Sequence, residues 1–285
     1  MFMNNILKST HPTFKGGVVL TANNLYLSNT SIKTFLTCKR KFKYKYIDRI
    51  NPNKDITNKY LSFGNSIHLA LADFNKLTID KYRTLDNLHN LLRRNWIRDG
   101  YESREEEKTF GLWGLDMLTN YYNNPKDDGS KNYIIEDMIF NNEHDYIICG
   151  KLDKVYKNSD GKTEIIDYKT SKNISPIDDL QLPLYLMLAN YKLGYYPEVV
   201  SLYYLPENKK ISKEVDDSFI KESITKILDL CDAIFNENDF TPTPNAYCKS
   251  YCEHYDICDA SKSEEALIVN ALTDIKNINT KEVLF

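Results

Sequence analysis

The sequence predicts an α/β protein in which helices flank a central mixed sheet. Two observations support this prediction. Apolar residues recur at helical spacing from about residue 31 to 123, whereas β-branched and aromatic residues dominate from 133 to 169. A helix, two further strands and another helix follow. This order is typical of a sheet that is covered by helices.

Turn and capping residues set the boundaries of the predicted elements. Ser28 to Thr30 can cap a helix over 31–48, and a loop over 124–130 separates the first helices from the strands. The other predicted helices begin near residue 60 or cover 82–98, 102–123, 178–193 and 217–236. The predicted strands cover 133–141, 145–157, 162–169, 198–205 and 210–215, with a short strand at 18–20.

Composition indicates a globular protein. Of 285 residues, 42% are apolar and 27% charged, which excludes gross disorder, and the net charge of −3 argues against a polybasic protein. The sequence has neither a long apolar run nor a recognisable signal peptide, so we expect a cytoplasmic protein without membrane contact. We expect an arm over 1–27, one domain over 28–260 and a helix or tail over 261–285. Within the domain we expect a helical part, a sheet core and a cysteine segment, over 28–130, 131–240 and 241–260.

Two strands around Asp160-Gly161 predict a β-hairpin that carries two carboxylates. With the turn centred on Asp160, Asp153 lies opposite Asp167, and Lys169 shares a face with Asp167. Opposed carboxylates repel each other unless a divalent cation such as Mg²⁺ lies between them, and a nearby lysine can position or deprotonate the attacking water. The pattern indicates either such a metal site or an exposed hairpin with a cross-strand salt bridge.

Four short motifs accompany this hairpin. They are Gly64-x-x-x-His68, Gly150-x-x-Asp153, Asp167-Tyr168-Lys169-Thr170 and Gln181-x-x-x-Tyr185. Together they resemble the PD-(D/E)xK nuclease superfamily, and more closely its RecB-like branch, although Leu152 stands where the pattern has proline. The resemblance implies a restriction-endonuclease-like fold and hydrolysis of phosphodiester bonds with Mg²⁺ or Mn²⁺.

The resemblance also implies roles for side chains that are ambiguous by themselves. A lone His68 on an apolar helix is more often a core residue, and Gln181 and Tyr185 on one helix face can be a surface pair. In the RecB-like context, His68 completes the metal site of Asp153 and Asp167. Gln181 and Tyr185 then belong with the catalytic residues, where they contact DNA or orient the reacting groups.

Three further acidic residues need interpretation. An acidic residue recurs in the family pattern at the place of Glu136, on the strand before Asp153. It can bind metal, support a ligand or simply face solvent. We interpret Asp160 and Glu164 as turn and surface residues.

Cys248, Cys252 and Cys258 lie within eleven residues near the C-terminus. In a cytosolic chain such clustering suggests a metal site, and tetrahedral zinc and cubane clusters usually need a fourth ligand. The candidates are Cys38, Cys149, Cys231 and His254.

Two of these candidates, Cys149 and Cys231, lie in apolar patterns typical of core thiols. Cys38 lies in a basic and aromatic segment. The iron–sulfur branch of RecB-like nucleases has one cysteine in such a segment and three near the C-terminus. The resemblance therefore implies a 4Fe–4S cluster that joins the chain ends, with zinc as the alternative.

The segment from Lys33 to Arg49 has seven basic residues and one acidic residue, Asp48. Basic side chains can bind phosphate, and aromatic rings can stack on unpaired bases. The alternative is a solvated amphipathic helix whose aromatic residues face the core. We expect both: a core contribution from Phe35, Phe42 and Tyr46, and outward-facing DNA contacts from Lys39, Arg40, Lys41 and Lys43.

By resemblance we expect an exonuclease on single-stranded DNA ends, similar to the CRISPR-associated exonuclease and related phage or plasmid enzymes. No P-loop is present, so the chain acts alone or with a helicase, recombination or CRISPR partner protein. Two alternatives stay open. The chain can be a non-catalytic DNA-binding or assembly factor on a nuclease fold, or a zinc-stapled interaction protein.

Overall fold

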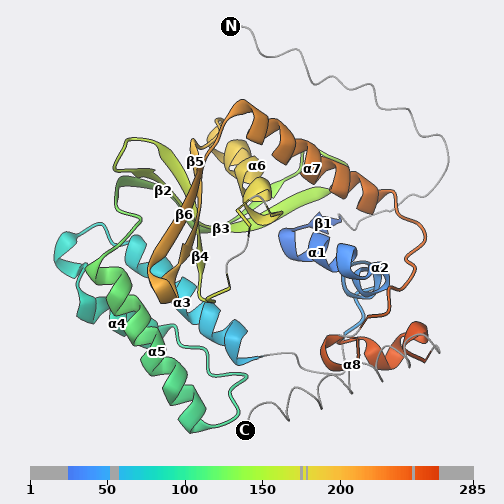
Figure 1. Cartoon of the computed structure of the whole chain (residues 1–285), viewed down its shortest axis with the longest axis horizontal. Coiled ribbons are helices and arrows are strands. Elements are labelled where there is room, and N and C mark those ends of the chain that lie inside the picture. The colour runs from blue at the N-terminus through green and yellow to red at the C-terminus, as the bar shows by residue number, and fades with distance from the viewer. Residues whose placement is uncertain (1–24, 52–57, 174–175, 178, 246–247, 263–285) are drawn as a thin grey trace, which may run out of the picture.

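The structure is a computed structural model that describes residues 25–51, 58–173, 176–177, 179–245 and 248–262. A six-stranded mixed sheet lies at its centre, and helices cover both faces (Figure 1). The predicted fold class is confirmed. None of the helices in the described ranges has the length and apolar content of a membrane span.

The sheet has the strand order β1-β3-β4-β5-β6, and β2 pairs with β3. β1 with β3 and β4 with β5 are parallel, and the other pairs are antiparallel. The strands are β1 (Tyr26–Leu27), β2 (Gly129–Asn141), β3 (Ile147–Asn158), β4 (Thr163–Lys169), β5 (Val199–Tyr204) and β6 (Lys209–Glu214).

The β3–β4 hairpin has the predicted register. Lys157 pairs with Thr163 and Lys154 with Ile166, where the pairing ends one position before Asp153 and Asp167. The turn is closed by Gly161, which takes a positive φ of 79°. β3 also pairs with two strands outside the hairpin. β2 pairs along one edge of β3, and the short β1 pairs along the other edge, where β4 also pairs.

One face of the sheet is covered by α1, α6 and α7, the other by α3, α4 and α5. The longer helices are α1 (Asn29–Thr37), α3 (Lys59–Asn75), α4 (Leu85–Arg94), α5 (Arg104–Asn123), α6 (Gln181–Leu193) and α7 (Asp217–Phe235). The short helical segments are α2 (Lys39–Phe42), η1 (Lys43–Ile47), η2 (Asp80–Tyr82), η3 (Leu205–Glu207), α8 (Cys248–Tyr251), η4 (Tyr255–Ile257) and η5 (Asp259–Lys262).

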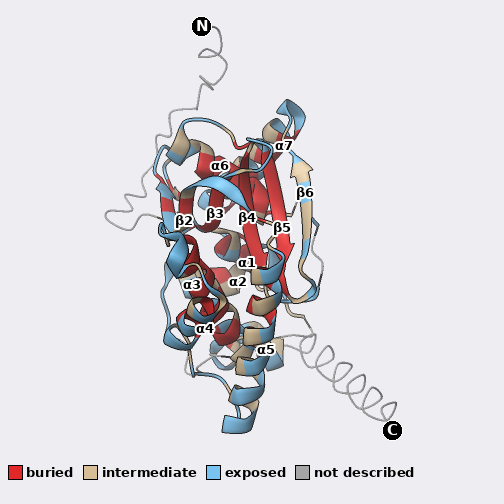
Figure 2. Cartoon of the chain, turned by 90° about the vertical axis from the view of Figure 1, so that its left-hand side faces the viewer, coloured by how far each residue is buried: buried red, intermediate tan, exposed pale blue. Residues whose placement is uncertain are grey.

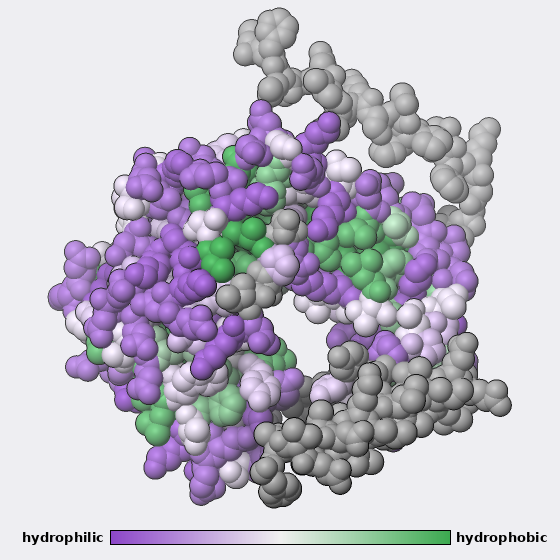
Figure 3. Space-filling view, viewed as in Figure 1, coloured by the Kyte–Doolittle hydropathy of each residue, from purple (hydrophilic) through white to green (hydrophobic). Residues whose placement is uncertain are grey.

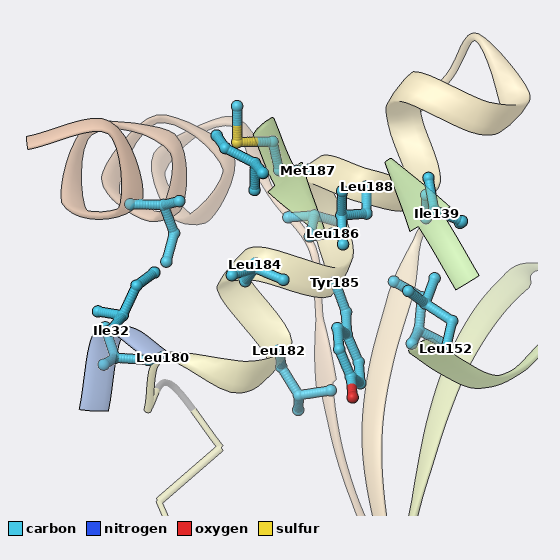
Figure 4. Close-up of a cluster of buried hydrophobic side chains, with 14 of the residues drawn as sticks. Ile32, Ile139, Leu152, Leu180, Leu182, Leu184, Tyr185, Leu186, Met187 and Leu188 are labelled. Carbon is cyan, nitrogen blue, oxygen red and sulfur yellow. The ribbon is translucent and has the colours of Figure 1, made fainter. Parts of the chain in front are cut away.

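The core between α6 and the sheet is apolar because α6 is buried on nearly all sides. Residues 182–189 are all buried, and they pack with Ile32 of α1, Ile139 of β2 and Leu152 of β3 (Figure 4). On the opposite face, Phe63 of α3 stacks on Trp113 of α5 with ring centroids 4.6 Å apart. Figure 2 shows buried central strands between these two helical layers.

The predicted helix over 31–48 is wrong as a single element. α1 ends at Thr37, Cys38 has an extended backbone with φ −160° and ψ 111°, and α2 and the π-helical η1 follow. Neither glycine nor proline marks this break in the sequence, so helical periodicity alone could not reveal it. The break matters because it orients Cys38 differently from its neighbours.

Several other boundaries differ from the prediction. The helix predicted over 82–98 is the shorter α4, and β1 was not predicted because two residues carry no periodicity. The strand predicted at 18–20 and the chain after 262 lie outside the described residues. The face in Figure 3 is largely hydrophilic, with an opening between α3 and the segment of α1 and α2.

Candidate metal centre and cysteine cavity

Asp153 of β3 and Asp167 of β4 lie where the backbone pairing of the two strands ends. Beyond the Lys154–Ile166 pair, the Asp153 carboxylate accepts a 2.8 Å hydrogen bond from the Tyr168 N–H. The two residues are 6% and 2% exposed. Burial and the Asp153 charge raise the pKa of Asp167 to about 6, against the effect of Lys169. Such a buried carboxylate pair favours a bound cation.

His68 of α3 reaches the same place. Its Nδ1 lies 3.1 Å from Asp153 Oδ1. Burial disfavours the imidazolium, but Asp153, Asp167 and other nearby carboxylates outweigh burial and raise the pKa of His68 to about 9. Gly64 lets this helix approach β4, because a Cβ there would lie 3.3 Å from Thr170 Oγ1. In the Gly64-x-x-x-His68 motif, the glycine therefore allows the close approach of the helix and the histidine supplies the imidazole.

Glu136 completes the group. The donor atoms of His68, Glu136 and Asp153 all lie within 4.8 Å of one another, which suits a metal ion. The Glu136 side chain is 7% exposed and pairs with Lys151, so the solvent-facing interpretation is wrong. Glu136 has a φ of 50°, and a non-glycine residue rarely takes this left-handed conformation. The strained backbone turns its carboxylate towards His68.

Lys169, Gln181 and Tyr185 form a hydrogen-bonded chain beside Asp167. Lys169 Nζ lies 2.7 Å from Asp167 Oδ2 and donates to Gln181 Oε1 at 2.7 Å. The Gln181 amide donates to Asp167 Oδ1 at 2.5 Å and to the Tyr185 hydroxyl at 3.0 Å. Gly150 brings α6 close enough for these contacts, because a Cβ there would lie 2.9 Å from a Leu188 methyl group.

The affinity of this site for Mg²⁺ is expected to increase with pH from about 6 to about 9. Coordination needs ionised Asp167, whose pKa is about 6, and neutral His68, whose pKa is about 9, so metal binding releases protons. Without metal, the raised His68 pKa stabilises the fold fully below pH 6.5, and this contribution is lost as pH rises through about 9. Calorimetric Mg²⁺ titrations across this range, with thermal unfolding in EDTA, measure both effects. A pH-independent affinity would contradict the proposed ligands.

A buried polar network lies behind the site, and sequence reasoning missed it. Lys154, next to Asp153, donates to Asp127 Oδ2 at 2.7 Å and to Asn75 Oδ1 at 3.2 Å. The hydroxyl groups of Tyr121 and Tyr168 donate to the same Asp127 oxygen at 3.1 and 2.5 Å. Alternation along the strand was the available signal, since it places Lys154 and Tyr168 on the face opposite Asp153.

Glu164 also corrects a prediction. It is 1% exposed and not a surface residue. Its carboxylate accepts hydrogen bonds from Tyr156, Asn158, Ser201 and Lys210. Lys210 balances the charge of this buried carboxylate, and the three neutral donors satisfy its oxygens.

The four predicted cluster ligands lie around one cavity. Cys38 and the cysteines at 248, 252 and 258 all line this cavity, which has a volume of about 270 Å³. Thr243 N–H contacts Cys38 Sγ at the same place, so the cavity brings together parts of the chain that are 205 residues apart. Cys149 and Cys231 are buried elsewhere, as expected of core thiols. Among the described residues, three or more of the cavity sulfurs do not come within 4.8 Å of one another.

The basic segment is half-buried, and its side chains contact the C-terminal part of the chain. Glu253 lies between Lys41 at 2.7 Å and Lys45 at 3.1 Å, and these cations outweigh burial and lower the pKa of Glu253 to about 2. Lys39 pairs with Glu237 at 2.5 Å, Arg40 Nε donates to Phe240 O at 2.8 Å, and Lys43 pairs with Asp48 at 2.5 Å. Lys39, Arg40 and Lys41 therefore contact residues near the C-terminal part of the chain, whereas Lys43 pairs locally with Asp48. Lys39 and Lys43 stay partly exposed, and DNA contact by these four cations stays a prediction.

A family model of the PD-(D/E)XK nuclease superfamily matches residues 26–259. This match includes the sheet, the His68 helix and the cysteine segment. The chain therefore belongs to the PD-(D/E)XK nuclease superfamily, a class of hydrolases that act on nucleic acids. A search among curated proteins gave no match.

Two solved structures are similar to this chain. The crystal structure of SSO0001 has 16% identity, covers 85% of this chain and 89% of its own, and gives a TM-score of 0.36. A crystal structure named "Putative exonuclease" from Eubacterium rectale has 12% identity, covers 81% and 88%, and gives a TM-score of 0.48. Both scores are below 0.5, so family membership rests on the sequence match.

Proposed function

We propose that this protein is a metal-dependent DNA nuclease of the RecB-like branch. The observation that carries the proposal is the meeting of His68 with Asp153 and Asp167, beside Lys169, where two strands part. A merely structural hairpin would need only its salt bridge. It would not need an imidazole beside two buried carboxylates, which together are a donor set that suits a divalent cation.

The donor set fits a divalent cation. His68, Glu136 and Asp153 lie close enough together to hold Mg²⁺ or Mn²⁺. Asp167 lies outside this group and contacts Lys169 and Gln181, and it would complete the site as the ligand that the RecB-like motifs imply. When bound, the ion would polarise a phosphoryl oxygen and lower the pKa of its water. The imidazole suits Mn²⁺ as well as Mg²⁺.

The remaining residues orient and supply charge. The Lys169 ammonium would position the attacking water or stabilise negative charge that develops on the phosphate. Gln181 contacts both Lys169 and Asp167, so it fixes their relative positions, and Tyr185 accepts a hydrogen bond that holds the amide. These contacts keep the reacting groups in place before substrate arrives.

We propose single-stranded DNA, processed from an end, as the substrate. Support comes from the RecB-like motifs and the basic segment. The latter can contact phosphate once ion pairs such as Lys39–Glu237 open. The proposal includes one domain over 28–260, a cytoplasmic location, and a helicase, recombination or CRISPR protein as partner.

Incubation of end-labelled single-stranded DNA with Mg²⁺ or Mn²⁺, with and without EDTA, tests the function. We expect mononucleotide or short products from one labelled end and no products in EDTA. Circular single strands and labelled duplex serve as substrate controls. DNA binding without cleavage under every metal condition would instead favour the non-catalytic binding factor.

We also propose that the four cavity cysteines bind a 4Fe–4S cluster. Support comes from the four cysteines that line one cavity and from the RecB-like motifs, whose iron–sulfur branch has the same arrangement of cysteines. In anaerobically purified protein, we expect about four irons per chain and a broad visible absorption band. Cys252→Ser should lose iron, whereas the core variant Cys231→Ala should keep it. Zinc in place of iron would support the zinc-stapled alternative.

A further inference from the structure

The side chain of His254 is buried, and its ring nitrogens are unpaired within the described part of the chain. It is 2% exposed, and neither ring nitrogen has a hydrogen-bond partner among the described residues. In either protonation state an imidazole ring carries at least one N–H donor. A neutral imidazole carries one N–H donor and one acceptor. Leaving the donor unsatisfied in a buried place costs stability, so a missing acceptor is expected nearby.

The surroundings of His254 identify that acceptor. The residue lines the same cavity as Cys38 and the three C-terminal cysteines. Tyr44 packs edge-to-face against its ring, with centroids 5.6 Å apart and planes at 66°. The neighbouring Glu253 carboxylate is occupied by Lys41 and Lys45. The cysteine sulfurs line the same cavity as the ring and can accept a hydrogen bond from it.

We propose that His254 donates a hydrogen bond to a sulfur of the cysteine-bound cluster and so sets its reduction potential. This inference rests on the proposed cluster. Four cysteines already complete the ligand set, so His254 is a positioning residue and not a ligand. A hydrogen bond to sulfur stabilises the more negative, reduced cluster, and hydrogen bonds to the sulfurs are one determinant of cluster potential.

Three variants separate this role from packing. His254→Phe keeps a ring against Tyr44 but has no donor, and His254→Gln keeps a neutral donor. His144→Phe is the matched control, because His144 stacks on Tyr146 and does not line the cavity. Each protein is purified without air, its iron and zinc are measured, and its cluster is titrated with dithionite.

We expect all three variants to retain iron. At a fixed applied potential, His254→Phe should lower the ratio of reduced to oxidised cluster about tenfold, which is about 59 mV for one electron. His254→Gln should recover part of the shift, and His144→Phe should match wild type. Equal potentials in all four proteins would overturn the proposal. Loss of iron in both His254 variants together would overturn it in favour of direct ligation.

A second measurement uses wild-type protein, so it tests the proposal even if the variants fail to fold. Pulsed paramagnetic resonance of the reduced cluster, in protein with ¹⁵N-labelled histidine, should detect one weakly coupled nitrogen. A strong coupling would mean ligation, and no coupling would mean no contact. Wild type that holds zinc and no iron would refute the cluster and this inference, whereas DNA cleavage tests the nuclease site separately.

Discussion

Replacing Lys169 with alanine is expected to lower metal-dependent DNA cleavage about 10³-fold, while Mg²⁺ affinity stays the same or increases. The ammonium lies 2.7 Å from Asp167 Oδ2 and is the cation closest to the carboxylate pair. Its removal takes away charge stabilisation at the reacting phosphate. The same removal takes away a repulsive charge from the metal site, so binding of the ion is not weakened at a pH well above the pKa of Asp167, where protons do not compete.

Asp153→Asn provides the contrast, because it removes a proposed ligand. We expect this variant to lose both Mg²⁺ binding and cleavage. The matched control is Asp137→Asn, since Asp137 lies on the adjacent strand, is about half exposed and forms an ion pair with Lys192 at 3.5 Å. Single-turnover cleavage and calorimetric metal titration separate the two effects. If Lys169→Ala cleaves at the wild-type rate, the hairpin is not the catalytic site.

Replacing Lys154 with methionine is expected to destabilise the protein by about 3–5 kcal/mol. The Lys154 and Asp127 side chains are 5% and 1% exposed, so the variant leaves a buried carboxylate without its cation. The hydroxyl groups of Tyr121 and Tyr168 remain, but they do not neutralise the charge. Urea unfolding, monitored by circular dichroism, measures the loss.

The double variant Lys154→Met with Asp127→Asn tests whether the loss comes from the unpaired charge. We expect it to recover much of the stability, because asparagine keeps the shape and accepts hydrogen bonds without a charge. Lys192→Met removes an exposed cation and should change little. A Lys154→Met protein as stable as wild type would mean that Asp127 is neutral in the fold.

Local sequence rules predicted the hairpin of the candidate site well. Asp160-Gly161 fixes the turn, and the turn fixes the register, because strand residues alternate and pair one by one. The position of Asp153 opposite Asp167 therefore followed from counting. His68 and Gln181 were different. Only the family motifs related their helices to the strands, since helix packing depends on contacts distant in sequence.

Other features had no local signal. The extended backbone at Cys38 interrupts a sequence that is helical in pattern, and the left-handed conformation of Glu136 interrupts a strand. The extended backbone of Cys38 is one that any residue adopts, whereas the positive φ of Glu136 departs from intrinsic preference. Both lie at candidate functional sites, where local rules are most often overridden. Glu164 was misread because charged residues are rarely buried, and its four donors come from other strand positions.

The cysteine cavity joins parts of the chain that are 205 residues apart. Closing so long a loop costs chain entropy that a hairpin does not incur, so the cavity is expected to assemble after the β3–β4 strands are in register. The same contacts then open first when the fold loosens. Oxidants would therefore reach the thiols around Cys38 while the sheet is still folded, and damage would begin at the cavity, away from the carboxylates.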